Sequence, residues 1–130
     1  MTARVVTVYR VEHAETHEGP YSTTKSRRGH REAMKRVGGI WGTPKHPGPE
    51  DDGCGFVARG VQFCGFTSQR ATRAWWHRGA LRLLCEAGFV VAAYRVPADA
   101  VRRGGHQCLF HRDRALSRRV LDHQFKEVPA

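Results

Sequence analysis

The sequence lacks close cysteine pairs. Its four cysteines, Cys54, Cys64, Cys85 and Cys108, stand at least ten residues apart. A disulfide-stapled domain is typically shorter and richer in cysteine, and a zinc ribbon needs cysteine pairs with only two to four residues between them. The eight histidines include no HExxH pair. We therefore expect free thiols, a reducing compartment and no metal site.

Long apolar runs are also absent. The longest extends from Phe89 to Tyr94, far short of the ~20 residues of a membrane-spanning helix. Residues 1–9 lack the basic region, apolar region and cleavage site of a signal peptide. We expect a cytoplasmic protein, with residues 1–130 in a single domain, that does not enter a membrane.

Acidic residues and lysine are scarce. The chain has 12 acidic residues against 22 basic ones, of which only four are lysine, and its net charge is +10. Such a charge attracts nucleic acid or acidic protein surfaces, although a GC-rich genome also favours surface arginine. The densest basic stretch provides candidate contacts for a partner: Arg27, Arg28, Arg31, Lys35 and Arg36. Further candidates follow later in the chain: Arg102, Arg103, Arg112, Arg114, Arg118 and Arg119.

The hydrophobic pattern predicts an α+β fold, a small mixed sheet with one main helix. Strands are expected at 4–12, within 55–66, at 89–96 and at 106–111, and the helix at about 68–87. The near-continuous apolar character of 89–96 indicates a central strand covered on both faces. Residues 13–55 form a long, loop-rich, basic insertion, and the tail from Asp113 fits either a helix or a strand.

Arg10 lies inside the first predicted strand and shares a face with Glu12. The opposite face, which carries Tyr9 and Val11, is more apolar and is expected to meet the core. A partly buried arginine needs an anionic partner. That partner is Glu12, an acidic residue on a neighbouring strand, or the phosphate of a ligand.

Other residues also permit two interpretations. Thr67 and Ser68 stand where a strand becomes a helix, and they either cap the helix or bind phosphate there. Trp75 and Trp76 point about 100° apart on a helix, so we expect one in the core and the other at its edge or against a ligand ring. Gln107 is expected in mid-strand, either as a satisfied polar residue or as a group that orients a substrate hydroxyl.

A resemblance to known proteins rests on short strings of residues. They are Val8–His13, Gly19–Tyr21, Gly65–Ser68, Trp75–Trp76 and Gly105–Phe110. The strings resemble small proteins encoded by phages and prophages, and their order resembles that of the ADP-ribosyltransferase fold. The resemblance implies that Arg10 holds the pyrophosphate side of NAD, that Thr67 and Ser68 form the hydroxyl motif, and that Gln107 stands at the position of the catalytic Glu.

The glutamine at this position leads to two hypotheses. Gln107 keeps a hydrogen bond to the ribose but lacks the negative charge, which costs about 10²–10³ in rate by analogy with oxyanion-hole variants. Either the protein uses NAD to modify a host macromolecule, with Glu12 or Glu32 replacing the missing carboxylate, or it is a non-enzymatic basic module that binds nucleic acid or an acidic host protein.

Overall fold

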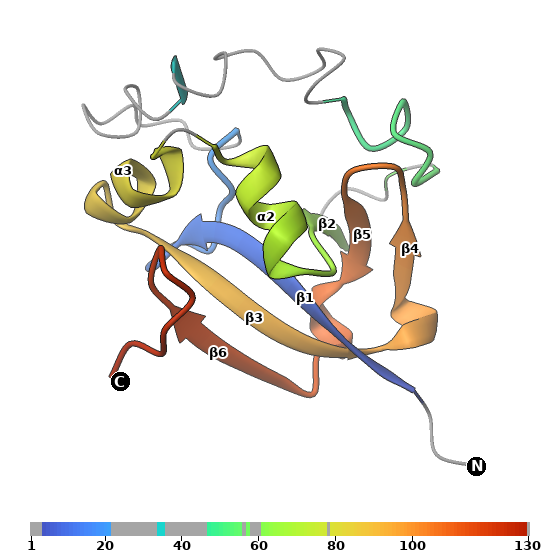
Figure 1. Ribbon diagram of the computed structural model, residues 1–130. Coiled ribbons are helices and arrows are strands. Elements are labelled where there is room, and N and C mark those ends of the chain that lie inside the picture. Colours follow the sequence, from blue (N-terminus) through green and yellow to red (C-terminus); the bar gives the residue numbers. More distant parts are fainter. Residues whose placement is uncertain are drawn as a thin grey trace.

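The computed structural model describes residues 4–21, 34–35, 47–55, 57, 61–77 and 79–129. These residues form a mixed α+β fold with two three-stranded antiparallel sheets (Figure 1). The first sheet has the order β1-β3-β6, with β1 at Val5–His13, β3 at Phe89–Pro97 and β6 at Ser117–Leu121. The second has the order β2-β5-β4, with β2 at Gln62–Gly65, β5 at Cys108–His111 and β4 at Val101–Arg103. The predicted single mixed sheet is therefore wrong.

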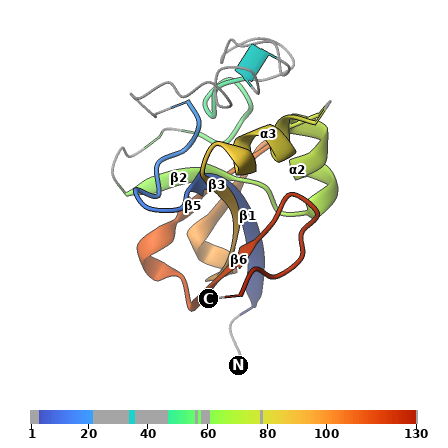
Figure 2. The ribbon, with the colours of Figure 1, turned by 90° about the vertical axis from the view of Figure 1, so that its left-hand side faces the viewer.

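Strand β3 is the centre of the fold. Val91 and Ala93 belong to a core shared with the helices, whereas Ala92, Tyr94 and Val96 belong to a second core shared with β5. Both faces of β3 are thus covered, as its apolar sequence predicts. Figures 1 and 2 show the two helices on one side of this strand.

Strand β1 is covered on both faces at its C-terminal half, which corrects the expected one-sided burial. Val11 packs in the helix-side core, but Val8, Arg10 and Glu12 on the other face are also buried. The second sheet covers this other face. Burial of its two charged side chains is tolerated because they neutralise each other, with Arg10 Nε 3.3 Å from a Glu12 carboxylate oxygen.

The predicted helix at 68–87 is two helices, α2 at Gln69–Trp75 and α3 at Ala80–Glu86. Gly79 breaks the helix, because its φ of 77° is a left-handed conformation that glycine adopts without strain. The apolar positions continue across the break, so Ala80 and Leu84 still reach the same core as Trp76. That continuity explains why the pattern resembles one helix.

The ambiguous tail is a strand rather than a helix. Arg112–Arg114 makes one 3-10 turn (η2), and β6 then pairs antiparallel with β3. Another 3-10 turn, Ala98–Ala100 (η1), follows β3. Strand β5 begins at Cys108, so Gln107 lies immediately before the strand and not within it, which corrects the mid-strand expectation.

Two hydrogen bonds join β1 to the end of the second sheet. The Tyr9 amide donates to the Phe66 carbonyl at 2.7 Å, and the Phe66 amide donates to the Tyr9 carbonyl at 2.8 Å. Gly65 makes this approach feasible, since a Cβ there would lie 2.6 Å from Val8 Cγ1 and 2.9 Å from the Tyr9 carbonyl oxygen. The residues around this bridge form the site described next.

Candidate functional site

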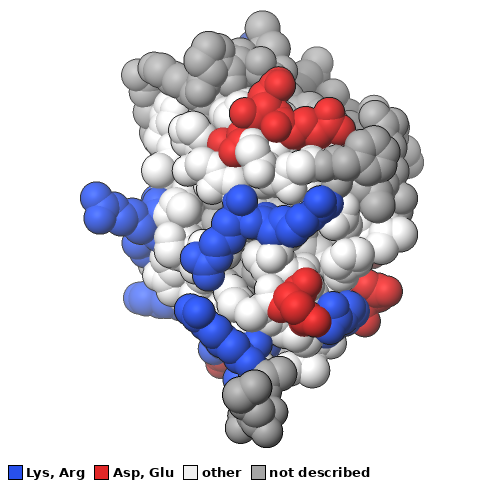
Figure 3. Space-filling view, turned by 90° about the vertical axis from the view of Figure 1, so that its right-hand side faces the viewer, with Lys and Arg blue, Asp and Glu red and all other residues white. Residues whose placement is uncertain are grey.

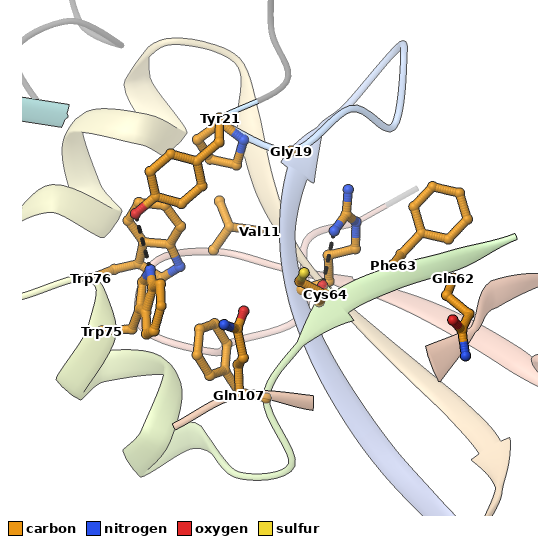
Figure 4. Close-up of a pocket in the computed structure, with 12 residues that line it drawn as sticks. Val11, Gly19, Tyr21, Gln62, Phe63, Cys64, Trp75, Trp76 and Gln107 are labelled. Carbon is orange, nitrogen blue, oxygen red and sulfur yellow. Dashed lines mark hydrogen bonds between the residues drawn. The ribbon is translucent and has the colours of Figure 1, made fainter. Parts of the chain in front are cut away.

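A pocket of about 220 Å³ opens beside the Tyr9–Phe66 bridge (Figure 4). Its walls come from β1, from the segment after β1, from β2, from α2 and from the residue before β5. The lining residues are Arg10, Val11, Gly19, Pro20, Tyr21, Gln62, Phe63, Cys64, Phe66, Trp75, Trp76 and Gln107. They combine aromatic rings with one cation and two amides, and no acidic residue is among them.

Aromatic side chains form one end of the pocket. The Tyr21 and Trp76 rings stack with centroids 5.5 Å apart, and the Phe66 and Trp75 rings are also 5.5 Å apart but tilted. Figure 4 shows Tyr21 directly above the two tryptophans. Burial raises the pKa of the Tyr21 hydroxyl to about 12, so this end of the pocket carries no charge near neutral pH.

The two tryptophans differ in the use of their indole N–H groups. Both are buried, at 4% and 5% exposure, so the expectation that one of them is peripheral is wrong. Trp75 Nε1 donates to the Tyr21 hydroxyl at 3.2 Å. Trp76 Nε1 is buried and has no hydrogen-bond partner among the described residues. The aromatic end of the pocket therefore holds one satisfied donor and one unsatisfied donor.

Arg10 lies at the other end of the pocket and is held on two sides. Its Nη1 donates to the Cys64 carbonyl at 2.8 Å, and its Nε faces Glu12. Gly19 leaves room for its third nitrogen, because a Cβ at that position would lie 3.1 Å from Nη2. Burial lowers the pKa of Arg10, and the nearby Glu12 carboxylate opposes this effect.

Glu12 is fully buried behind Arg10, at the centre of a cluster of positive groups. Its carboxylate lies 2.8 Å from Arg118 Nη2, 3.6 Å from Arg112 Nη1 and 3.3 Å from Arg10 Nε. The Tyr94 hydroxyl lies 2.8 Å from both carboxylate oxygens. We call these five residues the Glu12 cluster. Three guanidinium groups face one carboxylate, which leaves an excess of two positive charges.

Gln107 is held in place by the segment at 47–55. Its side-chain Nε2 donates to the Pro47 carbonyl at 2.7 Å, and its main-chain amide donates to the Asp52 carboxylate at 2.8 Å. Asp52 also accepts from the His106 amide and lies 2.7 Å from His106 Nδ1. Burial raises the pKa of Asp52, but these hydrogen bonds outweigh it, so the net shift is downward. Gln107 Oε1 remains as an acceptor at the pocket.

The structure brings together only part of the predicted site. Arg10 and Gln107 line one pocket, whereas Thr67 and Ser68 are not among its lining residues. Ser68 instead caps α2, its Oγ accepting from the Ala71 amide at 3.0 Å, which is one of its two predicted roles. Glu12 does not line the pocket, and Glu32 lies outside the described residues.

The predicted basic contacts are divided among several environments. Arg27, Arg28, Arg31 and Arg36 lie outside the described residues, and Lys35 is exposed. Arg112 and Arg118 belong to the Glu12 cluster, whereas Arg114 and Arg119 form exposed ion pairs with Asp99 and Glu127. Arg102 and Arg103 are exposed on β4. Figure 3 shows Lys and Arg side chains over the middle of one face, with acidic side chains above and below them.

Cysteines and histidines add no further site in the described part of the chain. All four cysteines are free, and burial raises the pKa values of Cys54 and Cys85 to about 11 and that of Cys108 to about 12. No group of three His, Cys, Asp or Glu residues among the described ranges could hold a metal ion. None of the described helices has both the length and the apolar character to cross a bilayer.

Comparison with known proteins identifies a phage family. A family model described as Bacteriophage T4 Y00F protein matches residues 1–124. The chain belongs to this family. The resemblance to small phage proteins is therefore confirmed. No curated protein and no solved structure matches the chain. No structural neighbour therefore supports the resemblance to the ADP-ribosyltransferase fold.

Membership of the Y00F family covers nearly the whole chain, including every lining residue of the pocket. Sequence reasoning selected Arg10 and Gln107 because polar residues in predicted strands need partners. It assigned no role to Tyr21 beyond its place in the resemblance, and it did not choose between Trp75 and Trp76. The signal for Tyr21 was its position directly after Gly19-Pro20, a pair that is typical of turns.

Proposed function

We propose that this protein binds NAD in the pocket between Arg10 and Trp76. The observation that carries the proposal is that Arg10 and Gln107, from opposite ends of the chain, line one pocket with several aromatic rings. The ADP-ribosyltransferase resemblance predicts these two residues in a single NAD site. Apolar pockets with a few convergent polar groups are also the usual form of nucleotide sites.

The charge distribution supports an anionic ligand group beside Arg10. Among the described residues, the Glu12 cluster holds three guanidinium groups and one carboxylate, an excess of two positive charges. Arg10 Nη2 lies close to Gly19, where a Cβ would come within 3.1 Å of it, and both residues line the pocket. In the proposed complex, a pyrophosphate oxygen accepts from Arg10 Nη2 in a charge-assisted hydrogen bond.

Gln107 would orient a ribose. Its Nε2 is occupied by the Pro47 carbonyl, so its Oε1 accepts from a ribose hydroxyl. A volume of about 220 Å³ is smaller than the roughly 300 Å³ at the lower end of whole-ligand pockets. One half of the dinucleotide, a ring with its ribose, would therefore lie in the pocket and the remainder outside it.

Transfer of ADP-ribose to a host macromolecule is the further step of this proposal. In such a transfer a carboxylate stabilises the cationic ribose of the transition state. No acidic residue lines the described pocket, and Glu12 is already held by three arginines. We therefore expect the wild-type protein to bind NAD but to cleave it slowly, and we expect Gln107→Glu to increase the rate of nicotinamide release.

Isothermal titration with NAD tests the proposal, with Arg10→Gln as the informative variant. A hydrogen bond to a charged group contributes about 1.5–3 kcal/mol, so the wild-type protein should bind NAD about 10–100-fold more tightly than the variant. Arg119→Gln is the matched control, because Arg119 forms an exposed ion pair remote from the pocket lining. Absence of wild-type binding at millimolar NAD would rule out the proposal, as would equal affinity in a folded Arg10→Gln protein.

The second candidate function is binding of nucleic acid or an acidic host protein. It is supported by the net charge of +10 and by the exposed Arg102 and Arg103 on β4. Each phosphate contact releases counterions, so binding to duplex DNA should weaken steeply between low and moderate salt. Arg103→Gln should reduce the salt dependence, whereas Arg10→Gln should not. Binding that does not respond to salt would exclude the nucleic-acid form of this function.

A further inference from the structure

Trp76 lines the pocket, and its indole N–H is a buried donor with no hydrogen-bond partner among the described residues. Figure 4 shows Trp76 at the aromatic end, beside Val11 and behind Tyr21. A buried, unsatisfied donor costs about 1–3 kcal/mol, and native proteins seldom keep one without a reason.

The neighbouring tryptophan shows that the fold can satisfy such a group. Trp75 occupies the same end of the pocket, and its Nε1 donates to the Tyr21 hydroxyl at 3.2 Å. The Tyr21 ring stacks on the face of Trp76. The single Tyr21 hydroxyl accepts a hydrogen bond from Trp75 Nε1, whereas Trp76 Nε1 has no such partner among the described residues. The difference between the two indoles is therefore in their partners and not in their burial.

We infer that Trp76 Nε1 selects the ring of the bound ligand by donating a hydrogen bond to a carbonyl oxygen on it. This inference rests on the proposed NAD site and adds its specificity-determining residue. The chemical class is a planar aromatic ring bearing a carboxamide, since the walls here are Tyr21, Phe66 and the two tryptophans. In NAD the group of this class is the nicotinamide ring.

The polar ends of the pocket agree with this orientation. Arg10 lies away from the aromatic end, on the side of Phe63, whose ring centroid is 5.2 Å from its guanidinium carbon. A ligand with its aromatic ring against Trp76 therefore directs its anionic group toward Arg10. Tyr21 remains protonated near neutral pH and adds no negative charge against the carbonyl oxygen.

The test compares nicotinamide with 3-methylpyridine, in which a methyl group replaces the carboxamide. Binding is measured by NMR titration in mildly alkaline buffer, where both compounds are uncharged. The wild-type protein should prefer nicotinamide, and Trp76→Phe should reduce its affinity for nicotinamide about threefold to tenfold, which corresponds to one neutral hydrogen bond. The affinity of the variant for 3-methylpyridine should change little.

Ser68→Ala is the control. It removes the N-cap of α2, the helix whose C-cap is Trp76, and changes no residue that lines the pocket, so it should lower the free energy of unfolding and yet retain the preference for nicotinamide. The wild-type protein gives an independent readout: the Trp76 indole N–H resonance, assigned in the wild-type spectrum through its contacts with the Tyr21 ring, should shift with nicotinamide and not with 3-methylpyridine. This second measurement holds even if Trp76→Phe fails to fold.

The outcomes separate the inference from the proposed function. A preference for nicotinamide that survives in folded Trp76→Phe overturns the inference, as does a wild-type protein that binds neither small compound. If the wild-type protein binds NAD but does not prefer nicotinamide over 3-methylpyridine, the NAD site is supported and the role proposed for Trp76 is wrong. If it prefers nicotinamide through Trp76 but does not bind NAD, the ring site stands and the dinucleotide site falls.

Discussion

The Glu12 cluster and the aromatic end of the pocket lie on either side of Arg10, and they differ in whether a buried polar group has a partner within the fold. Glu12 is fully buried and has three arginines and a tyrosine hydroxyl around it. Trp76 is almost as buried, yet its N–H has no acceptor in the described chain. One region surrounds its buried carboxylate with charged partners from the fold, although Arg10 Nε has an ion pair and no hydrogen bond there. The other region leaves an uncharged donor without any partner in the described chain.

This difference distinguishes polar groups that contribute to the stability of the fold from polar groups that are available to a ligand. A network that is satisfied within the fold stabilises it, and breaking the network is costly because charges are left without partners. An unsatisfied buried donor destabilises the free protein and becomes favourable only when a ligand supplies the acceptor. Arg10 belongs to both regions, since it pairs with Glu12 and also lines the pocket.

The largest expected effect comes from breaking the Glu12 cluster. Glu12→Gln keeps the shape of the side chain but leaves three guanidinium groups without an anion, which should lower the free energy of unfolding by about 3–5 kcal/mol. Urea denaturation measures this change. Glu127→Gln is the control, because the exposed Arg119–Glu127 pair should contribute about 0–1 kcal/mol. Equal losses in the two variants would show that the cluster does not hold the fold.

A smaller effect is expected where Asp52 holds Gln107 at the pocket. Asp52→Asn weakens hydrogen bonds from the amides of His106 and Gln107, at a cost of about 1.5–3 kcal/mol. The folded pKa of Asp52 lies below its ordinary value of 3.8, so its contribution is present above that pH and is lost as the pH falls through the folded pKa.

Denaturation midpoints measured across acidic pH check this prediction. The wild-type protein should lose stability below about pH 3.8, and Asp52→Asn should lose less over the same interval. Asp51→Asn is the control, since Asp51 is exposed beside it. Identical acid profiles for the wild-type protein and Asp52→Asn would contradict the role given to Asp52.

The smallest effect is expected at Ser68, outside both regions. Ser68→Ala removes the acceptor for the Ala71 amide, so the free energy of unfolding should fall by about 1 kcal/mol. NAD affinity should not change, because Ser68 does not line the pocket. Calorimetry on the variant measures both quantities. A loss of NAD affinity comparable to that of Arg10→Gln would show that Ser68 takes part in ligand binding.

Parts of the fold were predictable from local patterns. The apolar run at 89–96 identified β3 and its covered faces, and Ser68 was recognisable as a cap. The break between α2 and α3 was missed because the apolar spacing continues through it, although Gly79 was the available signal. Two-sided burial of β1 was missed because it depends on the second sheet, which pairs distant segments.

The site was predictable only in its polar residues. Arg10 and Glu12 stood out because charges inside a strand need partners, and their pairing is confirmed. Whether an indole N–H finds an acceptor depends on the positions of Tyr21 and Trp75 in three dimensions. The sequence contains no local signal for that difference.

The Tyr9–Phe66 bridge has a consequence for how the protein unfolds. Among the described residues, this isolated bridge joins the two sheets through one pair of main-chain hydrogen bonds, and the pocket beside it is lined from both sheets. A bound molecule would contact both sheets at once and oppose their separation. Occupancy should therefore make unfolding more cooperative and slow amide exchange in β2 together with β1, two strands far apart in the sequence.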